Sequence, residues 1–118
     1  MCGLYGVAGF SGNLRELDAQ FAQADASLRH RGPDDHGSHV DPLTRSRLGF
    51  RRLAIRDLSR AGRQPMASLD GRFTIVFNGE IYNVEELLQL YERAAGAPML
   101  RRGHSDTETL LAAIAAWG

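Results

Sequence analysis

The sequence predicts an α+β fold, in which strands and helices follow one another without the regular strand-helix-strand repeat of a Rossmann domain. Three observations predict it: apolar runs that lack a helical period, three apolar series at helical spacing, and Asn-Gly and Gly-Pro-Asp signals of tight turns. With 118 residues, the chain can form one modest domain.

The N-terminal part is expected to form a strand, a helix and a loop. Residues 3–10 mix apolar residues with glycines, which suits a strand that another group approaches closely. Asn13 and Glu16 have the spacing of a capping box, and the apolar residues that follow predict a helix over 14–28. The run Arg-His-Arg-Gly-Pro-Asp-Asp-His-Gly at 29–37 predicts a tight loop.

The C-terminal part is expected to form two strands and then two helices. Residues 46–55 have no helical period, and residues 72–77 alternate before an Asn-Gly pair. Two capping-box pairs precede apolar series at helical spacing, namely Asn83 with Glu86 and Ser105 with Glu108.

Composition excludes some classes of partner and indicates the cellular compartment. The 14 basic residues balance the 14 acidic ones, so we expect no partner nucleic acid and no membrane surface. A single cysteine excludes an internal disulfide, and the absence of a leader or an apolar span of about 20 residues favours a cytoplasmic protein. The four histidines lack the spacing of helical metal ligands, so no metal is expected.

Cys2 is the candidate nucleophile. A small second residue allows the initiator methionine to be removed, which would place a free α-amine beside the thiol. An α-amine has a pKa of about 7.7 to 8.0 and can accept the thiol proton near neutral pH. The alternative is a cysteine that serves as a small buried hydrophobic residue.

Five motifs occur in order along the chain. They are M-C-G-L-Y-G-V-A-G, R-H-R-G-P-D, R-L-A-I, F-N-G-E-I-Y-N and S-D-T-E, and they extend from Cys2 to Glu108. In this combination the chain resembles the glutaminase domain of glutamine-hydrolysing asparagine synthetases, which are class II glutamine amidotransferases with an N-terminal nucleophile.

The resemblance implies a catalytic role for three residues. Cys2 would attack the side-chain amide of glutamine, giving a thioester and ammonia, and water would then release glutamate. Asn78 and the backbone N–H of Gly79 would stabilise the oxyanion. From the residues alone, Asn-Gly between two strand-like runs is also a strong hairpin signal, with positive φ at both positions.

Three further residues match the family's substrate contacts. Arg52 would bind the α-carboxylate of glutamine, a task suited to a planar guanidinium, although it could be one solvated arginine among others. Glu80 and Asp106 would receive the α-ammonium group. Asp106 also fits an acidic residue in the first turn of a helix, and Glu80 fits a surface position. The loop at 31–34 is interpreted as a scaffold bordering the site.

The implied fold is that of an N-terminal-nucleophile hydrolase, a four-layer α-β-β-α sandwich. Residues 1–118 would be the N-terminal part of a class II glutamine amidotransferase domain, incomplete as a sandwich. No S-G-G-x-D-S motif is present, so ATP and Mg²⁺ belong to a synthetase domain absent from this chain. We expect no cofactor here, L-glutamine as the ligand, and a homodimer or pairing with a synthetase domain.

Three interpretations remain open. In the first, ammonia from glutamine is destined for the amidation of aspartate or a related carboxylate. The others are a different N-terminal-nucleophile amidohydrolase and a truncated fragment without catalytic activity.

Overall fold

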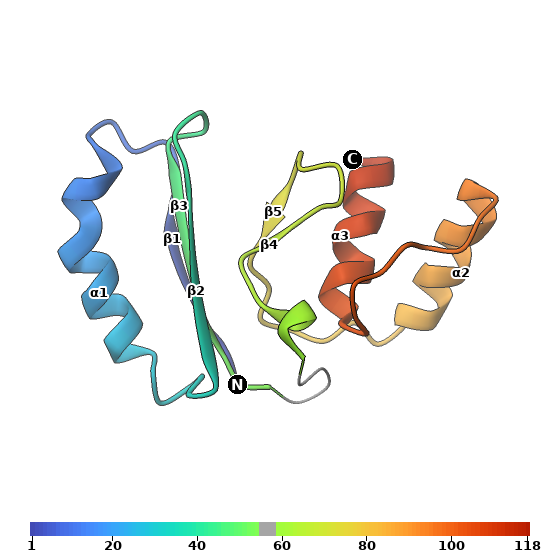
Figure 1. Cartoon of the computed structure of the whole chain (residues 1–118), viewed down its shortest axis with the longest axis horizontal. Helices are drawn as coiled ribbons and strands as arrows, with labels where there is room; N and C mark the ends of the chain where they lie inside the picture. The colour runs from blue at the N-terminus through green and yellow to red at the C-terminus, as the bar shows by residue number, and fades with distance from the viewer. Residues whose placement is uncertain (55–58) are drawn as a thin grey trace. The chain divides into compact units, whose positions relative to one another are not determined.

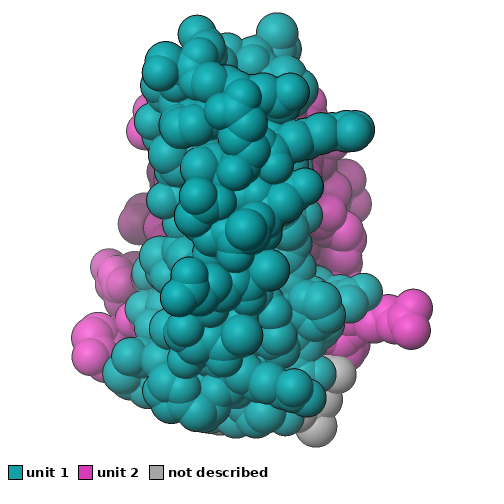
Figure 2. Space-filling view, turned by 90° about the vertical axis from the view of Figure 1, so that its left-hand side faces the viewer, with its two compact units in different colours: residues 1–54, 63–65, 76–78 teal, residues 55–62, 66–75, 79–118 magenta. Residues whose placement is uncertain are grey.

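The structure is a computed structural model that describes residues 1–54 and 59–118. The chain divides into two compact units, shown in Figure 1 and coloured separately in Figure 2. The first unit comprises residues 1–54, 63–65 and 76–78. The described part of the second unit comprises residues 59–62, 66–75 and 79–118.

The first unit is built on a three-stranded antiparallel sheet of order β1-β3-β2. Its strands are β1 (Gly3–Val7), β2 (Asp35–Asp41) and β3 (Ser46–Arg52). A short 3₁₀ helix, η1 (Leu14–Leu17), leads into α1 (Asp18–Ser27), which runs along the sheet (Figure 1). The η1 N-cap is Asn13, whose side chain accepts a hydrogen bond from the Arg15 N–H at 3.0 Å.

The sheet face that α1 covers combines aromatic packing with ion pairs. The ring of Tyr5 packs against Phe21 with centroids 5.3 Å apart, and its hydroxyl donates to the Asp25 carboxylate at 3.0 Å. Arg51 forms an ion pair with the same carboxylate. Gly49 lies opposite Tyr5, and a Cβ there would be 2.2 Å from the Tyr5 Cζ, so glycine leaves room for the phenol ring.

The opposite face of the sheet carries Phe50, whose side chain is only 1% exposed. Gly37 pairs with Phe50, and its missing side chain lets the backbone of Gln64 approach, since a Cβ at Gly37 would lie 2.1 Å from the Gln64 carbonyl oxygen. Arg63 binds the carboxylate of Asp35 in a two-point fork with contacts of 2.6 and 2.8 Å. Residues 63–65 are thereby attached to β2.

The second unit contains a two-stranded antiparallel sheet and two longer helices. The sheet pairs β4 (Met66–Ala67) with β5 (Thr74–Ile75), and a one-turn 3₁₀ helix, η2 (Arg60–Gly62), lies earlier in this unit. α2 (Val84–Ala95) ends at Gly96, which has a φ of 68°. It packs against α3 (Asp106–Trp117), where Tyr91 and Trp117 meet edge to face at 6.2 Å. Among the described residues of this unit, the largest fully buried apolar side chain is that of Leu111.

The mixed strand and helix content and the antiparallel pairing agree with the α+β prediction. The helix over 14–28 and the two C-terminal helices are confirmed. The strand over 3–10 is confirmed but shorter, and the strand over 46–55 ends at Arg52, with Ile55 outside the described residues. The four-layer sandwich stays a prediction.

Two local predictions are confirmed only in part. The loop over 29–37 was too long, because β2 begins at Asp35; its residues are polar on both faces and give no hydrophobic alternation. In the run 72–77, ladder pairing is limited to Thr74–Ile75. The hairpin turn instead lies at residues 68–73, where Gly71 has a φ of 72°.

Candidate active site

Cys2 lies directly before β1, and its sulfur contacts the backbone of Leu53. The Leu53 N–H donates to Sγ at 3.3 Å, and Sγ lies 3.6 Å from the Leu53 carbonyl oxygen. The thiol is half-buried, whereas Met1 is 75% exposed. The backbone of Leu53 thus contacts the sulfur through both its N–H and its carbonyl group.

Arg52 is the last residue of β3, and its side chain is buried at 8% exposure. In the pairing of β1 with β3, Gly3 lies opposite Arg51, so extending the register by one residue places Cys2 opposite Arg52. A hydrogen bond from Arg63 lowers the pKa of Asp35 most strongly, and the charge of Arg52 lowers it further. Arg52 therefore acts electrostatically at the same end of the sheet as the thiol.

The loop at residues 31–34 is hydrogen-bonded to Cys2 and packs against the end of β3. Arg31 donates from Nε to the Cys2 carbonyl at 3.2 Å. The Asp34 N–H donates to the Arg52 carbonyl at 3.0 Å, and the Asp34 carboxylate accepts from the Ala54 N–H at 2.8 Å. A Cβ at Gly32 would lie 2.4 Å from the carbonyl carbon of Arg51, so the loop backbone packs directly against the strand. These contacts support the scaffold interpretation.

Asn78 belongs to the first unit and is exposed. The preceding residue, Phe77, is bound through both its N–H and its carbonyl by the side-chain amide of Gln64, at 2.5 and 3.1 Å. Neither Asn78 nor Gly79 is among the described residues with positive φ, so the type I′ hairpin alternative is wrong. Sequence analysis missed Gln64, because a single buried amide has no periodic signature.

Gly79, Glu80 and Asp106 belong to the second unit, where Gly79 and Glu80 are exposed. The carboxylate of Asp106 accepts from the Ile81 N–H at 3.0 Å and from the Thr107 N–H at 2.9 Å. Asp106 is the first residue of α3, as its helix-dipole interpretation requires. Its hydrogen bond to the Ile81 N–H connects the start of α3 to the segment that carries Gly79 and Glu80.

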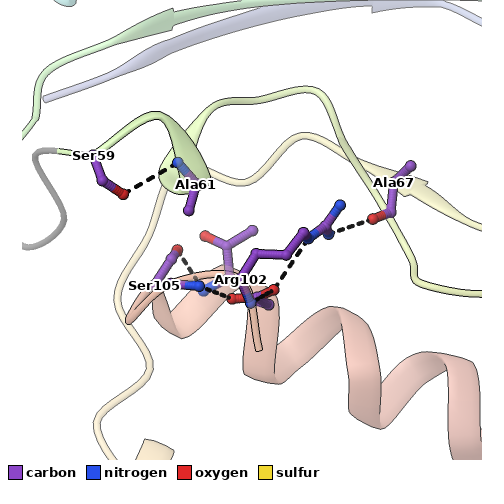
Figure 3. A network of polar contacts seen from close by, with 8 residues as sticks. Ser59, Ala61, Ala67, Arg102 and Ser105 are labelled. Atoms are coloured by element: carbon purple, nitrogen blue, oxygen red, sulfur yellow. Dashed lines mark hydrogen bonds and ion pairs between the residues drawn. The ribbon is translucent and has the colours of Figure 1, made fainter. Parts of the chain in front are cut away.

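A second carboxylate in the first turn of α3 is buried. Glu108 is 4% exposed, and its oxygens accept from the backbone N–H groups of Arg102 and Gly103 at 2.7 and 3.0 Å. The Arg102 guanidinium pairs with the same carboxylate at 3.2 Å and also donates to the Ala67 carbonyl at 2.6 Å (Figure 3). The predicted capping box therefore contributes Ser105 as N-cap, while Glu108 fastens the preceding loop.

Residues 1–54 and 59–118 contain no group of three or more histidine, cysteine, aspartate or glutamate side chains arranged to hold a metal ion. In the same ranges, no helix has the length and apolar character needed to cross a membrane.

Comparison with known proteins identifies similar sequences. A family model described as a glutamine amidotransferase domain matches residues 1–118. The chain is 38% identical over 119 residues to asparagine synthetase [glutamine-hydrolyzing] 3 of Bacillus subtilis, covering 99% of the chain and 18% of that protein. It is 40% identical over 114 residues to asparagine synthetase [glutamine-hydrolyzing] 1 of the same organism, covering 95% and 17%.

A putative asparagine synthetase [glutamine-hydrolyzing] of Mycobacterium tuberculosis H37Rv is 36% identical over 132 residues, covering 100% of the chain and 20% of that protein. The chain thus spans about a fifth of the length of the curated relatives it matches.

Proposed function

Because the chain belongs to the glutamine amidotransferase domain family, we propose that it performs a glutaminase half-reaction, hydrolysing L-glutamine to glutamate and ammonia through a thioester on Cys2. The observation that carries the proposal is the placement of a half-buried thiol opposite a buried guanidinium at the end of one β ladder. The names of the relatives, which are glutamine-hydrolysing, support the choice of glutamine.

The reaction begins with removal of Met1, whose high exposure makes it accessible to an aminopeptidase. The α-amine of Cys2 then takes the thiol proton, and the sulfur attacks the side-chain carbonyl carbon of glutamine. Collapse of the tetrahedral state breaks the carbon–nitrogen bond, and the proton held by the amine leaves with ammonia. Water adds to the thioester in the same manner, giving glutamate and the free thiol.

Both tetrahedral states carry negative charge on the former carbonyl oxygen. The family resemblance assigns its stabilisation to the Asn78 side chain and the Gly79 N–H. Loss of one such donor typically costs about 10² to 10³ in rate. The non-hairpin backbone at this pair favours the catalytic role over the turn role.

Selection of an amino acid as substrate needs a cation and an anion at fixed positions. In the proposal, Arg52 binds the α-carboxylate, and Glu80 with Asp106 binds the α-ammonium group. The burial of Arg52 supports its role, because a guanidinium shielded from water binds a carboxylate more strongly than an exposed one. The two N–H donors on Asp106 hold its carboxylate in one orientation.

The ammonia released would serve amidation of aspartate or a related carboxylate by a synthetase domain that uses ATP and Mg²⁺. This part rests on the relatives, which are about five times longer than the chain. Pairing with such a domain is proposed on the same basis. Homodimer formation and a cytoplasmic location are proposals from the sequence, the location because the single cysteine fits a reducing compartment.

The test is glutamate release from glutamine by the purified chain, with intact mass to establish loss of Met1. We expect a signal that disappears in Cys2→Ala. A folded protein that has lost Met1 and forms no glutamate would refute autonomous catalysis and favour the truncated-fragment interpretation. Hydrolysis of other amides in preference to glutamine would favour a different N-terminal-nucleophile hydrolase.

A further inference from the structure

Gln64 holds the backbone of Phe77 with both ends of its side-chain amide. Oε1 accepts from the Phe77 N–H at 2.5 Å, and Nε2 donates to the Phe77 carbonyl at 3.1 Å. A neighbouring strand satisfies a residue in the same way, with one donor and one acceptor. The Gln64 residue is only 8% exposed, so water competes weakly for these two bonds.

Gln64 is held in place by β2. Its carbonyl oxygen occupies the space that a side chain at Gly37 would fill. The preceding residue, Arg63, makes the two-point ion pair with Asp35, which is two residues before Gly37 on the same strand face. A backbone approach and a bidentate ion pair thus fix this segment on the sheet whose first strand follows Cys2.

The position of the Phe77 backbone determines the position and orientation of the Asn78 backbone. The Phe77 carbonyl and the Asn78 nitrogen share one planar peptide group, so holding that carbonyl sets the plane from which Asn78 departs. Asn78 itself is exposed, and support by packing is correspondingly small. A sub-ångström error in a donor aimed at an oxyanion weakens it substantially.

We propose that Gln64 is a positioning residue for Asn78, and that the order β2, Gln64, Phe77, Asn78 aligns the oxyanion donor with the sheet that carries Cys2. The inference rests on the proposed function, in which Asn78 acts on the oxyanion. In the proposal Gln64 touches no reacting atom and acts on Asn78 through the backbone of Phe77.

The inference makes a kinetic prediction that differs from that for a substrate-binding residue. The oxyanion exists in the tetrahedral states and not in bound glutamine, so misalignment of Asn78 lowers kcat and leaves KM nearly unchanged. We expect Gln64→Met, which keeps the length of the side chain and removes its two hydrogen bonds to Phe77, to lower kcat about 10- to 100-fold. KM should change by less than about threefold.

A second variant disturbs Gln64 through a substitution in β2. Gly37→Ala places a methyl group against the Gln64 carbonyl and leaves the amide of Gln64 intact. It should reproduce the fall in kcat at constant KM. Thr44→Val is the matched control, because it removes a single hydrogen bond of 2.7 Å to Asp41 at the β2–β3 turn, and it should keep the wild-type kcat.

The experiment measures glutaminase kinetics and backbone amide exchange on the full chain. Faster exchange at the Phe77 amide in Gln64→Met, with unchanged exchange at the Phe50 amide in β3, together with the fall in kcat, supports the inference. Wild-type kcat in Gln64→Met overturns it, as does a Phe77 amide that exchanges no faster than in Thr44→Val.

Failure of the proposed function has a separate signature. If the wild-type chain releases no glutamate, the glutaminase proposal fails, and amide exchange then decides the positioning role alone. An increase confined to residues 77–79 in both Gln64→Met and Gly37→Ala supports it, and its absence in either variant overturns it.

Discussion

Cys2 lies one residue beyond the paired part of β1, opposite Arg52 in the register that pairs Gly3 with Arg51. A β ladder has a fixed side-chain period, so this register brings both residues to one end and one face of the sheet. The loop at 31–34 then bonds to the Cys2 carbonyl through Arg31 and packs on the strand through Gly32. The proposed nucleophile and carboxylate-binding residue are therefore located by backbone geometry, which makes their supports testable.

Arg31→Lys should impair catalysis more than stability. The substitution keeps the positive charge but loses the planar Nε–H that donates to the Cys2 carbonyl. Loss of a hydrogen bond from a charged donor is worth about 1.5 to 3 kcal/mol, which corresponds to about 10- to 100-fold in kcat if all of it acts on Cys2. Glutaminase kinetics and thermal unfolding measure the two effects. Arg29→Lys, at an exposed position in the same segment, is the control, and equal losses in both variants would contradict the prediction.

Gly32→Ala should destabilise the first unit. Its methyl group would meet three backbone atoms of Arg51 and Arg52 at 2.4 to 2.5 Å, and backbone cannot rotate away. Overpacking of this kind typically costs about 1 to 3 kcal/mol, to be measured by urea unfolding. In the control Gly12→Ala, the new methyl group meets the outer ends of two side chains, those of Phe10 and Glu16, and should cost less. The reverse order of stabilities would show that the loop lies farther from β3.

The environment of Tyr5, including its hydrogen bond to Asp25, should make the free energy of unfolding depend on pH in the alkaline range. Burial, reinforced by that hydrogen bond, raises the pKa of Tyr5 from 10.0 to about 12. Between these values the unfolded chain loses the phenolic proton and the folded chain keeps it. The contribution to stability is therefore complete below about pH 10 and is lost as the pH rises toward 12.

Tyr5→Phe removes this titration, so its deficit in the free energy of unfolding relative to wild type should shrink from pH 10 to 12. Urea titrations at successive pH values measure it. Tyr82→Phe, at a tyrosine that is 96% exposed, should follow the wild-type curve. A deficit for Tyr5→Phe that stays constant across this range would exclude a raised pKa as its cause.

The sequence predicts the fold best where patterning is strong. Helical spacing identified all three helical regions. The side chains of Asn13 and Ser105 accept cap hydrogen bonds as predicted, whereas the side chain of Asn83 makes none. Strand β2 escaped detection because it reads Asp-His-Gly-Ser-His-Val-Asp and carries no apolar alternation. Its place in the sheet is decided by pairing with β3, a long-range contact that a local pattern does not contain.

The candidate site also contains residues that the sequence predicts and residues that it does not. Motif order predicts Cys2 and Arg52 as site residues, and the register of the β ladder places them opposite each other. The sequence did not point to Gln64, and it indicated Glu108 only as part of a capping box, because polar residues usually lie at the surface and these two are buried. Their roles depend on which backbone groups reach them after folding.

Glu108→Ala should weaken both the loop before α3 and the binding of glutamine. Its carboxylate holds the N–H groups of Arg102 and Gly103, and Asp106 lies between that loop and Glu108 in the chain. Hydrogen bonds to a charged group are worth about 1.5 to 3 kcal/mol each, so unfolding in urea should shift clearly. Because Asp106 is proposed to bind the ammonium group equally in ground and transition states, KM for glutamine should rise about tenfold with kcat nearly unchanged.

The control for that substitution is Glu92→Ala, which removes one carboxylate bond, to the Met99 N–H at 3.1 Å, elsewhere in the same unit. It should lower stability without raising KM. The double variant Arg102→Ala with Glu108→Ala should be less destabilised than the sum of its parts, by about 0.5 to 3 kcal/mol, because Arg102→Ala alone strands a buried carboxylate. Strict additivity would mean that the Arg102 guanidinium contributes through Ala67 alone. A KM that rises equally in Glu92→Ala would assign the effect to general loosening of the unit and remove Glu108 from the support of Asp106.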